Sequence, residues 1–80
     1  MNTKQAVAER IIELCREKQV AINAIANISG ISPSTIYSIL NAKSKNPEIV
    51  TVKKICDGLE ISLAEFFDTD VFRQLEQEIK

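Results

Sequence analysis

The sequence contains no histidine and no tryptophan, and it has only two cysteines in 80 residues. Without histidine, neither a Ser/His/Asp nor a Cys/His catalytic set can form, and two cysteines alone cannot complete a structural zinc site. A Gly-rich phosphate-binding loop is also missing. The acidic residues are spread along predicted helix surfaces, where nothing holds a pair of them in a desolvated pocket. The sequence therefore argues against an enzyme and predicts neither a metal site nor a cofactor.

Residues that break helices and residues with large aromatic rings are scarce as well. The chain has two glycines, two prolines, three phenylalanines and one tyrosine. Every glycine and proline falls at a predicted break or helix end, which favours helices joined by short connections. With so few aromatic side chains, the core must be filled mainly by Ile, Val, Leu and Ala. A chain of this length forms one compact core, so we predict a single all-α domain.

Long hydrophobic runs are absent too. No apolar stretch approaches the roughly 20 residues that a membrane span requires, and the first residues lack the apolar segment of a signal peptide. We therefore expect a cytoplasmic protein without a membrane association. Cys15 and Cys56 lie on apolar faces of predicted helices and are expected to be small buried thiols, since a disulfide is rare in a reducing compartment.

The stretch from Val20 to Pro47 organises the chain as two short helices that meet at Gly30. The first helix is predicted over residues 22–29, and glycine suits the turn that ends it because it tolerates a positive φ. Ser32 is a good N-cap and Pro33 fits the first helical position, so a second helix is predicted over 33–41. This second helix buries Ile36, Ile39 and Leu40. Two helices joined by a tight turn are the layout of a helix-turn-helix.

The outer face of the second helix carries short or planar hydrogen-bonding groups, namely Ser34, Thr35, Tyr37, Ser38 and Asn41. A helix of this kind fits the major groove of DNA, which is about 12 Å wide, and Ser and Thr can pair with any base there. The alternative is that these hydroxyls merely keep a surface helix soluble. Two features count against that alternative: Ser and Thr are mediocre helix formers, and the face carries no acid that would repel phosphates.

The charge distribution is uneven, although the net charge of −1 is not that of a basic nucleic-acid-binding protein. Residues 32–54 contain four lysines and one acid, whereas residues 55–80 contain seven acids and two basic residues. A basic region just after the helix-turn-helix suits DNA, and the acidic third should face away from it. A solvated charged surface is the other interpretation.

The remaining helices complete the predicted core. They are expected over residues 3–18, over 49–58 with Ile49 buried, from a capping box at Ser62 and Glu65 onward, and over 71–79 with Asp70 as the cap. The last of these is amphipathic, and its apolar face is formed by Val71, Phe72, Leu75 and Ile79. We predict a domain at 1–68 followed by this helix at 69–80. An isolated helix of that length is marginal in water, so it either packs back on the domain or meets a second subunit.

The ordered set Ile25-Ala26, Gly30-Ile31-Ser32, Ser34-Thr35-Ile36, Asn46-Pro47 and 59–67 resembles the Cro/C1-type (XRE-type) helix-turn-helix domain over about residues 4–68. The resemblance implies a compact five-helix, lambda-repressor-like fold, here with an additional C-terminal helix, whose third helix enters the major groove. The residues that it implies for base reading are Pro33, Ser34 and Ser38, with Thr35 and Tyr37 adjacent. Those implied for phosphate contact are Asn41, Lys43, Ser44 and Lys45. Two positions depart from the family pattern, because Ile22 stands where a phosphate-gripping Gln is common and Pro33 offers no donor.

Three hypotheses about function follow. The first is a transcriptional regulator, specifically a repressor, that binds a double-stranded DNA operator in a sequence-specific way, as the resemblance implies, with recognition helix 33–41 in the major groove. The second is an antitoxin-like or adaptor module that uses the same fold to hold a protein partner. The third, which is compatible with the first, is a homodimer formed through Val71, Phe72, Leu75 and Ile79.

Overall fold

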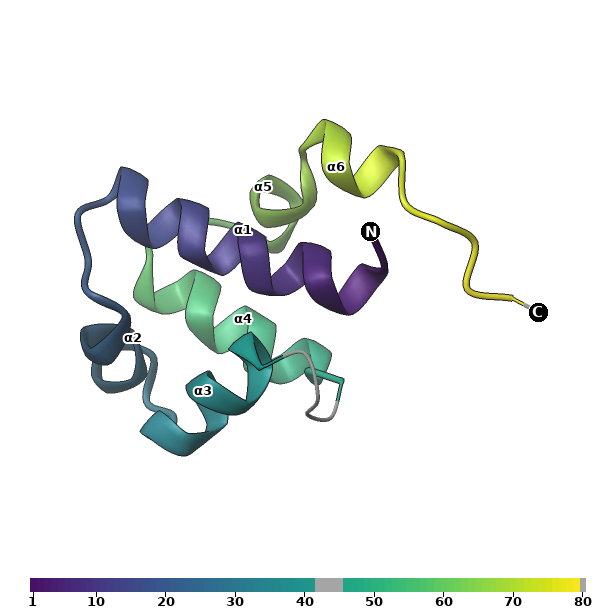
Figure 1. Cartoon of the computed structure of the whole chain (residues 1–80). Helices are drawn as coiled ribbons and strands as arrows, with labels where there is room; N and C mark the ends of the chain where they lie inside the picture. Colours follow the sequence, from purple (N-terminus) through teal and green to yellow (C-terminus); the bar gives the residue numbers. More distant parts are fainter. Residues whose placement is uncertain (42–45, 80) are drawn as a thin grey trace.

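The computed structural model describes residues 1–41 and 46–79. Within those ranges the chain forms six helices and no strand: α1 (Thr3–Glu17), α2 (Ile22–Ser29), α3 (Pro33–Leu40), α4 (Ile49–Gly58), α5 (Leu63–Phe67) and α6 (Asp70–Arg73). Figure 1 shows α1 and α4 crossing the middle of the molecule, with α2 and α3 on one side and α5 and α6 on the other. The prediction of an all-α fold is confirmed. None of the described helices is long and apolar enough to cross a bilayer.

The helix-turn-helix forms at the predicted residues. Gly30 has a φ of 67°, in the left-handed region, and the N–H of Ile31 reaches back to the carbonyl of Ala26 at 3.0 Å. This is the hydrogen-bond pattern by which a left-handed residue closes the end of a helix. The side chain of Ser32 then accepts from the N–H of Thr35, with proline at the first position of α3. The turn therefore follows from local sequence chemistry.

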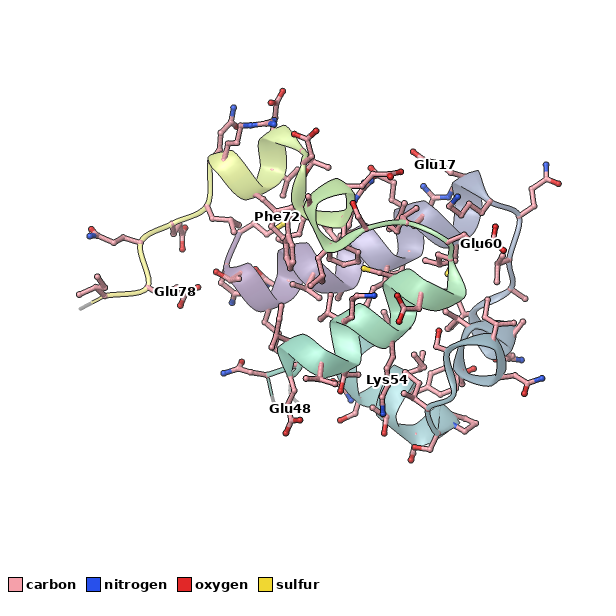
Figure 2. All side chains as sticks on the ribbon, turned by 180° about the vertical axis from the view of Figure 1, so that it is seen from behind. Glu17, Glu48, Lys54, Glu60, Phe72 and Glu78 are labelled. Carbon is pink, nitrogen blue, oxygen red and sulfur yellow. The ribbon has the colours of Figure 1, made fainter. Side chains whose placement is uncertain are left out.

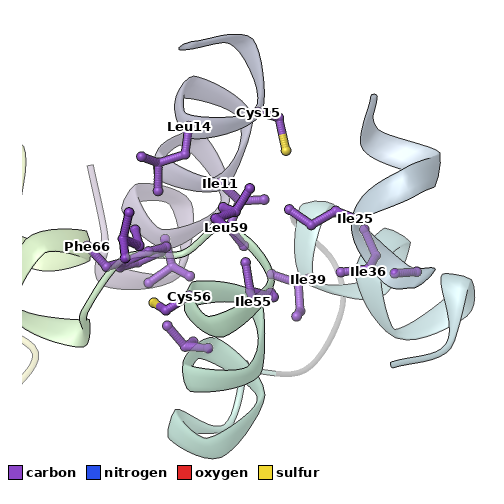
Figure 3. Close-up of a cluster of buried hydrophobic side chains, with 14 residues drawn as sticks. Ile11, Leu14, Cys15, Ile25, Ile36, Ile39, Ile55, Cys56, Leu59 and Phe66 are labelled. Carbon is purple, nitrogen blue, oxygen red and sulfur yellow. The ribbon is translucent and has the colours of Figure 1, made fainter. Parts of the chain in front are cut away.

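The core is a single cluster of mainly aliphatic side chains, with Phe66 and two cysteines, from α1 to α5 (Figure 3). Its fully buried members are Phe66, Ile11, Ile25, Ile36, Ile55 and Cys56. Burying an Ile or Phe side chain contributes about 1.5–3 kcal/mol, and these side chains come from five different helices. The core thus holds α2 and α3 against α1 and α4, which sets the orientation of the helix-turn-helix.

Three helix ends are formed by residues that were not predicted to terminate or cap a helix. Gln19 and Glu60, rather than glycines, take the left-handed conformation after α1 and α4, with φ of 57° and 61°. Val20 N–H bonds to Cys15 and Ile61 N–H bonds to Cys56, both to the backbone carbonyl, so both ends close as α2 does. At the start of α1, Asn2 and Gln5 form a full capping box, which was not predicted.

The prediction for α4 is right at its end, and it is wrong about the burial of its first residue. Gly58 is the last helical residue, as predicted. A Cβ on it would meet Oγ of Ser29 at 2.6 Å, so its lack of a side chain allows α2 and α4 to approach closely. Ile49 was predicted to be buried, but it is 59% exposed. The prediction was wrong because α4 begins beyond the edge of the core, whose first buried α4 residue is Val52.

The C-terminal helix is shorter than predicted. It spans Asp70–Arg73 with Thr69 as its cap, and residues 75–79 are not helical. The ring of Phe72 packs edge-on against that of Phe67, with centroids 4.9 Å apart, and Figure 2 shows it directed from α6 toward the body of the molecule. The four apolar residues predicted to form one helix face therefore do not share a helix, since Leu75 and Ile79 lie beyond its end.

The segment after α6 contacts the start of the chain. Oε2 of Glu78 accepts hydrogen bonds from the backbone N–H of Thr3 at 3.1 Å and from its hydroxyl at 2.8 Å. The terminal amine of Met1 lies 3.8 Å from Oε1 of Glu76. Negative charge at a helix N-terminus is favourable, so Glu76 and Glu78 stabilise the first turn of α1. These two residues were predicted to lie in a continuous helix over 71–79.

Candidate nucleic-acid interface

The N-terminus of α3 is built from three hydroxyl groups. Oγ of Ser32 accepts from the N–H of Thr35 at 3.3 Å, and it also lies 3.1 Å from Oγ of Ser34 and 2.8 Å from Oγ1 of Thr35. Two of the residues predicted to read bases thus share hydrogen bonds with the cap of their own helix. Each hydroxyl can both donate and accept, so these contacts leave Ser34 and Thr35 with further capacity for hydrogen bonds.

The rest of the predicted reading face is open to solvent. Pro33, Ser34, Tyr37 and Ser38 are exposed, whereas Thr35 is half-buried. Ile36 and Ile39, which alternate with them along α3, are buried at 1% and 4% exposure. The helix therefore presents one polar face to solvent and one apolar face to the core, as the spacing predicted.

The hydroxyl face of α3 forms one side of a hollow whose other side was not predicted from the sequence. Ser34, Thr35 and Ser38 line an open hollow of about 510 Å³, and the opposite wall is formed by Asn46, Pro47, Glu48 and Thr51 at the start of α4. The sequence carried one signal for it, since Pro47 marks the approach to α4. The surface for a ligand thus comprises the outer face of α3 and the first turn of α4.

Only one of the four predicted phosphate-contacting residues can be placed. Asn41 is exposed and follows the last residue of α3, and its carbonyl accepts a hydrogen bond from Nζ of Lys4 at 3.1 Å. Lys43, Ser44 and Lys45 lie outside the described residues. Lys4 therefore brings a positive charge from α1 to the end of α3, where it also complements the helix dipole.

The charges of α4 divide into two kinds. Lys53 is ion-paired with Asp57 one turn later. Lys54 is exposed, and Figure 2 shows it pointing from α4 toward the side on which α3 lies. Glu48 is the one acid that lines the hollow beside α3. The face is thus mixed in charge, and Lys54 can add positive charge to it that Lys53 cannot.

Two acids of the C-terminal third lie away from α3. Asp68 and Asp70 are ion-paired with Arg73 at α6, on the opposite side of α1 and α4 from α3 (Figure 1). Hydrogen bonds from Arg73 to Asp70 and the nearby charge of Asp68 raise the pKa of the Arg73 guanidinium. Negative charge on that side lies away from the hydroxyl-lined face of α3, as expected for a surface that meets phosphates.

The two thiols offer no metal site. Cys15 and Cys56 are both buried and unpaired. Burial raises the pKa of both thiols, and the neighbouring Asp57 carboxylate raises the pKa of Cys56 further. Both therefore stay protonated at neutral pH, and the described residues contain no cluster of His, Cys, Asp and Glu suited to a metal ion.

Comparisons with known proteins agree with this arrangement. The profile of the Cro/C1-type HTH DNA-binding domain matches residues 10–70. Two relatives from Bacillus subtilis (strain 168) are similar in sequence. The HTH-type transcriptional regulator SlrR is 37% identical over 62 residues, which is 76% of this chain and 41% of SlrR. The HTH-type transcriptional repressor RghR is 32% identical over 57 residues, which is 71% of this chain and 42% of RghR.

A solved structure is similar over nearly the whole chain. The crystal structure of the prophage Lp1 protein 11 superposes with a TM-score of 0.83 and 33% identity, and it covers 94% of this chain and 100% of that one. The chain spans less than half the length of the curated regulators. With the helix-turn-helix, its exposed polar helix face and the matched profile, the chain belongs to the Cro/C1-type helix-turn-helix DNA-binding domain family.

Proposed function

We propose that this chain binds double-stranded DNA in a sequence-specific way and regulates transcription as a repressor, with α3 in the major groove. The observation that carries the proposal is the exposed, acid-free hydroxyl face of α3, held on a helix-turn-helix whose other face is buried in the core. Relatives named as a transcriptional regulator and a transcriptional repressor support it. The protein-interaction alternative has no comparable support. DNA in a bacterium lies in the cytoplasm, so we propose that location.

The proposed contacts fall into two groups. Ser34, Ser38 and Tyr37 would meet base edges, with Pro33 and Thr35 beside them supplying apolar contact such as the thymine methyl accepts. The phosphate contacts would come from Asn41, Lys43, Ser44 and Lys45, joined by Lys54. Phosphate contacts give affinity and register without sequence information, whereas the base contacts give sequence preference.

We also propose that the chain acts as a homodimer, because two copies suit the two half-sites of a pseudo-palindromic operator. The contact would not be a four-residue helix face, since Phe72 packs against Phe66 and Phe67 of its own chain. Val71, which is 46% exposed, and Ile79, which is 81% exposed, remain available for it. Sedimentation of the full chain against Val71→Glu tests this, because equal masses for the two would exclude Val71 from the interface.

The DNA-binding proposal is tested by fluorescence anisotropy after selection from random duplexes. Binding to the selected duplex should weaken steeply with salt, because each neutralised phosphate releases counterions. A protein that selects no duplex, and binds none in a salt-sensitive way at micromolar concentration, would show the proposal to be wrong. Ser38→Ala should change which sequence is preferred.

A matched pair of variants separates DNA contact from general charge. Lys54→Ala and Lys53→Ala remove the same charge from neighbouring positions of α4, but Lys53 is already paired with Asp57. Lys54→Ala should weaken binding to all duplexes and lower the salt slope by about 1. Lys53→Ala should leave the slope nearly unchanged. If both slopes fall by about 1, the ion pair does not keep Lys53 from the phosphates; if neither falls, Lys54 makes no phosphate contact.

A further inference from the structure

Tyr37 joins the two helices of the helix-turn-helix outside the core. Its side chain is 51% exposed, yet its hydroxyl donates a hydrogen bond to Oδ1 of Asn23. Asn23 is the second residue of α2 and is itself exposed. The bond therefore spans from the recognition helix to the start of the preceding helix, on the surface proposed to face DNA.

The effect of this bond is on orientation more than on stability. A hydrogen bond between exposed side chains replaces bonds to water and so adds little to the free energy of folding. It does, however, hold the Tyr37 ring in one arrangement beside Ser38. Ordering a loose side chain during association costs roughly 2- to 10-fold in affinity, and a ring that is already held avoids that loss.

The direction of the bond also limits what Tyr37 can recognise. Because its proton is used on Asn23, the phenol oxygen is left as an acceptor. The donors that bases present in the major groove are the N6 amino group of adenine and the N4 amino group of cytosine. A Tyr37 with a free hydroxyl could instead donate to carbonyl or ring-nitrogen acceptors and would discriminate less.

We propose that Asn23 is a positioning residue for base recognition: it holds Tyr37 so that the phenol oxygen accepts a hydrogen bond from the amino group of adenine or cytosine. This inference rests on the proposed DNA-binding function. It adds a residue of α2 to those that determine sequence specificity. The N-cap of α2, Ala21, makes no side-chain hydrogen bond.

The test is a double-mutant cycle read out by selection from random duplexes. The proteins are the wild type, Asn23→Ala, Tyr37→Phe and the double variant, and Asn27→Ala is the control because it makes the same change one turn later on the exposed side of α2. Both single variants should lose roughly 2- to 10-fold in discrimination at the same base pair. The double variant should lose no more than either, and the control should match the wild type.

Each other outcome has a distinct meaning. If the wild type selects no sequence, the proposed function fails and the inference fails with it. If the wild type is selective but Asn23→Ala keeps its full preference, the inference alone is wrong. Losses that add up in the double variant would also overturn it, because Asn23 would then act on DNA independently of Tyr37.

Replacing one base then tests the acceptor role of Tyr37. At the base pair identified by the cycle, adenine is replaced by purine, or cytosine by 2-pyrimidinone, so that only the amino group is removed. Wild-type binding should weaken roughly 2- to 10-fold, whereas binding by Tyr37→Phe should not change. Equal weakening in both proteins would contradict the proposed hydrogen bond.

Discussion

Replacing Gly58 by alanine separates two physical roles that a glycine at a helix end can have. The backbone of Gly58 is helical and the positive φ after α4 belongs to Glu60, so alanine is compatible with the backbone. The space is the obstacle. A Cβ at this position would lie 2.6 Å from Oγ of Ser29 and 3.1 Å from the carbonyl oxygen of Ile28.

The magnitude follows from two opposed effects. Overpacking of this kind costs about 1–3 kcal/mol, whereas replacing glycine by alanine within a helix gains at most about 1 kcal/mol. Because Gly58 is the last residue of α4, the gain should be smaller than that. We expect Gly58→Ala to lower the free energy of unfolding by about 1–2 kcal/mol, measured by urea denaturation. The melting temperature should fall by about 4–8 °C for each kcal/mol.

A second variant identifies the atom responsible. Oγ of Ser29 is buried and makes no hydrogen bond within the part of the chain that the structure describes. Ser29→Ala should therefore raise stability by about 1 kcal/mol, and Gly58→Ala on that background should cost less than half its cost in the wild type. The reasoning is refuted if Gly58→Ala stabilises the protein, or if its cost is the same with and without the Ser29 hydroxyl.

Four further outcomes are expected. Glu60→Gly should raise the free energy of unfolding by about 0.5–1 kcal/mol, since glycine adopts a positive φ without strain, and the urea midpoint would report it. Ser32→Ala should lower it by about 1 kcal/mol through loss of the α3 cap, in the same assay. Glu48→Gln should tighten binding to every duplex alike by roughly threefold at 0.1 M salt, measured by anisotropy, because the acid beside α3 repels phosphates. Cys15 and Cys56 should resist iodoacetamide at pH 8, because burial raises both thiol pKa values, and should react once urea unfolds the chain; rapid labelling of the native protein would contradict their burial.

The helix-turn-helix was predictable because its signals are local. A glycine at the turn, a serine cap and a proline at the first helical position act within a few residues of one another. The spacing of Ile36 and Ile39 then decided which face of α3 is buried. The same logic placed α1, α2 and α4 to within a residue at each end.

The errors fall where distant parts of the chain interact. A continuous helix over 71–79 fits the apolar spacing, but Phe72 instead completes an aromatic cluster with Phe66 and Phe67. Glu78 makes contact with Thr3, 75 residues away. No local propensity encodes either contact, since helices this short depend on what they pack against.

Only part of the candidate interface could be predicted. The exposed hydroxyl face of α3 follows from helical spacing alone. The wall formed by Glu48 and Thr51 and the hydrogen bond between Tyr37 and Asn23 could not be predicted in this way, because each depends on how two helices are placed relative to each other.

The sequence by itself thus determined an all-α chain of short helices, a helix-turn-helix at Gly30, the polar face of α3 and the family resemblance, since periodicity, caps and turns act over one or two helical turns. Only the tertiary structure decided which neighbours each helix meets. In the folded chain, Gly58 lets α2 and α4 pack closely, and Glu78 contacts the start of α1. The hydroxyl of Tyr37 links α3 to Asn23 of α2. Those features depend on the packing of the whole core, in which side chains from five helices fill one volume.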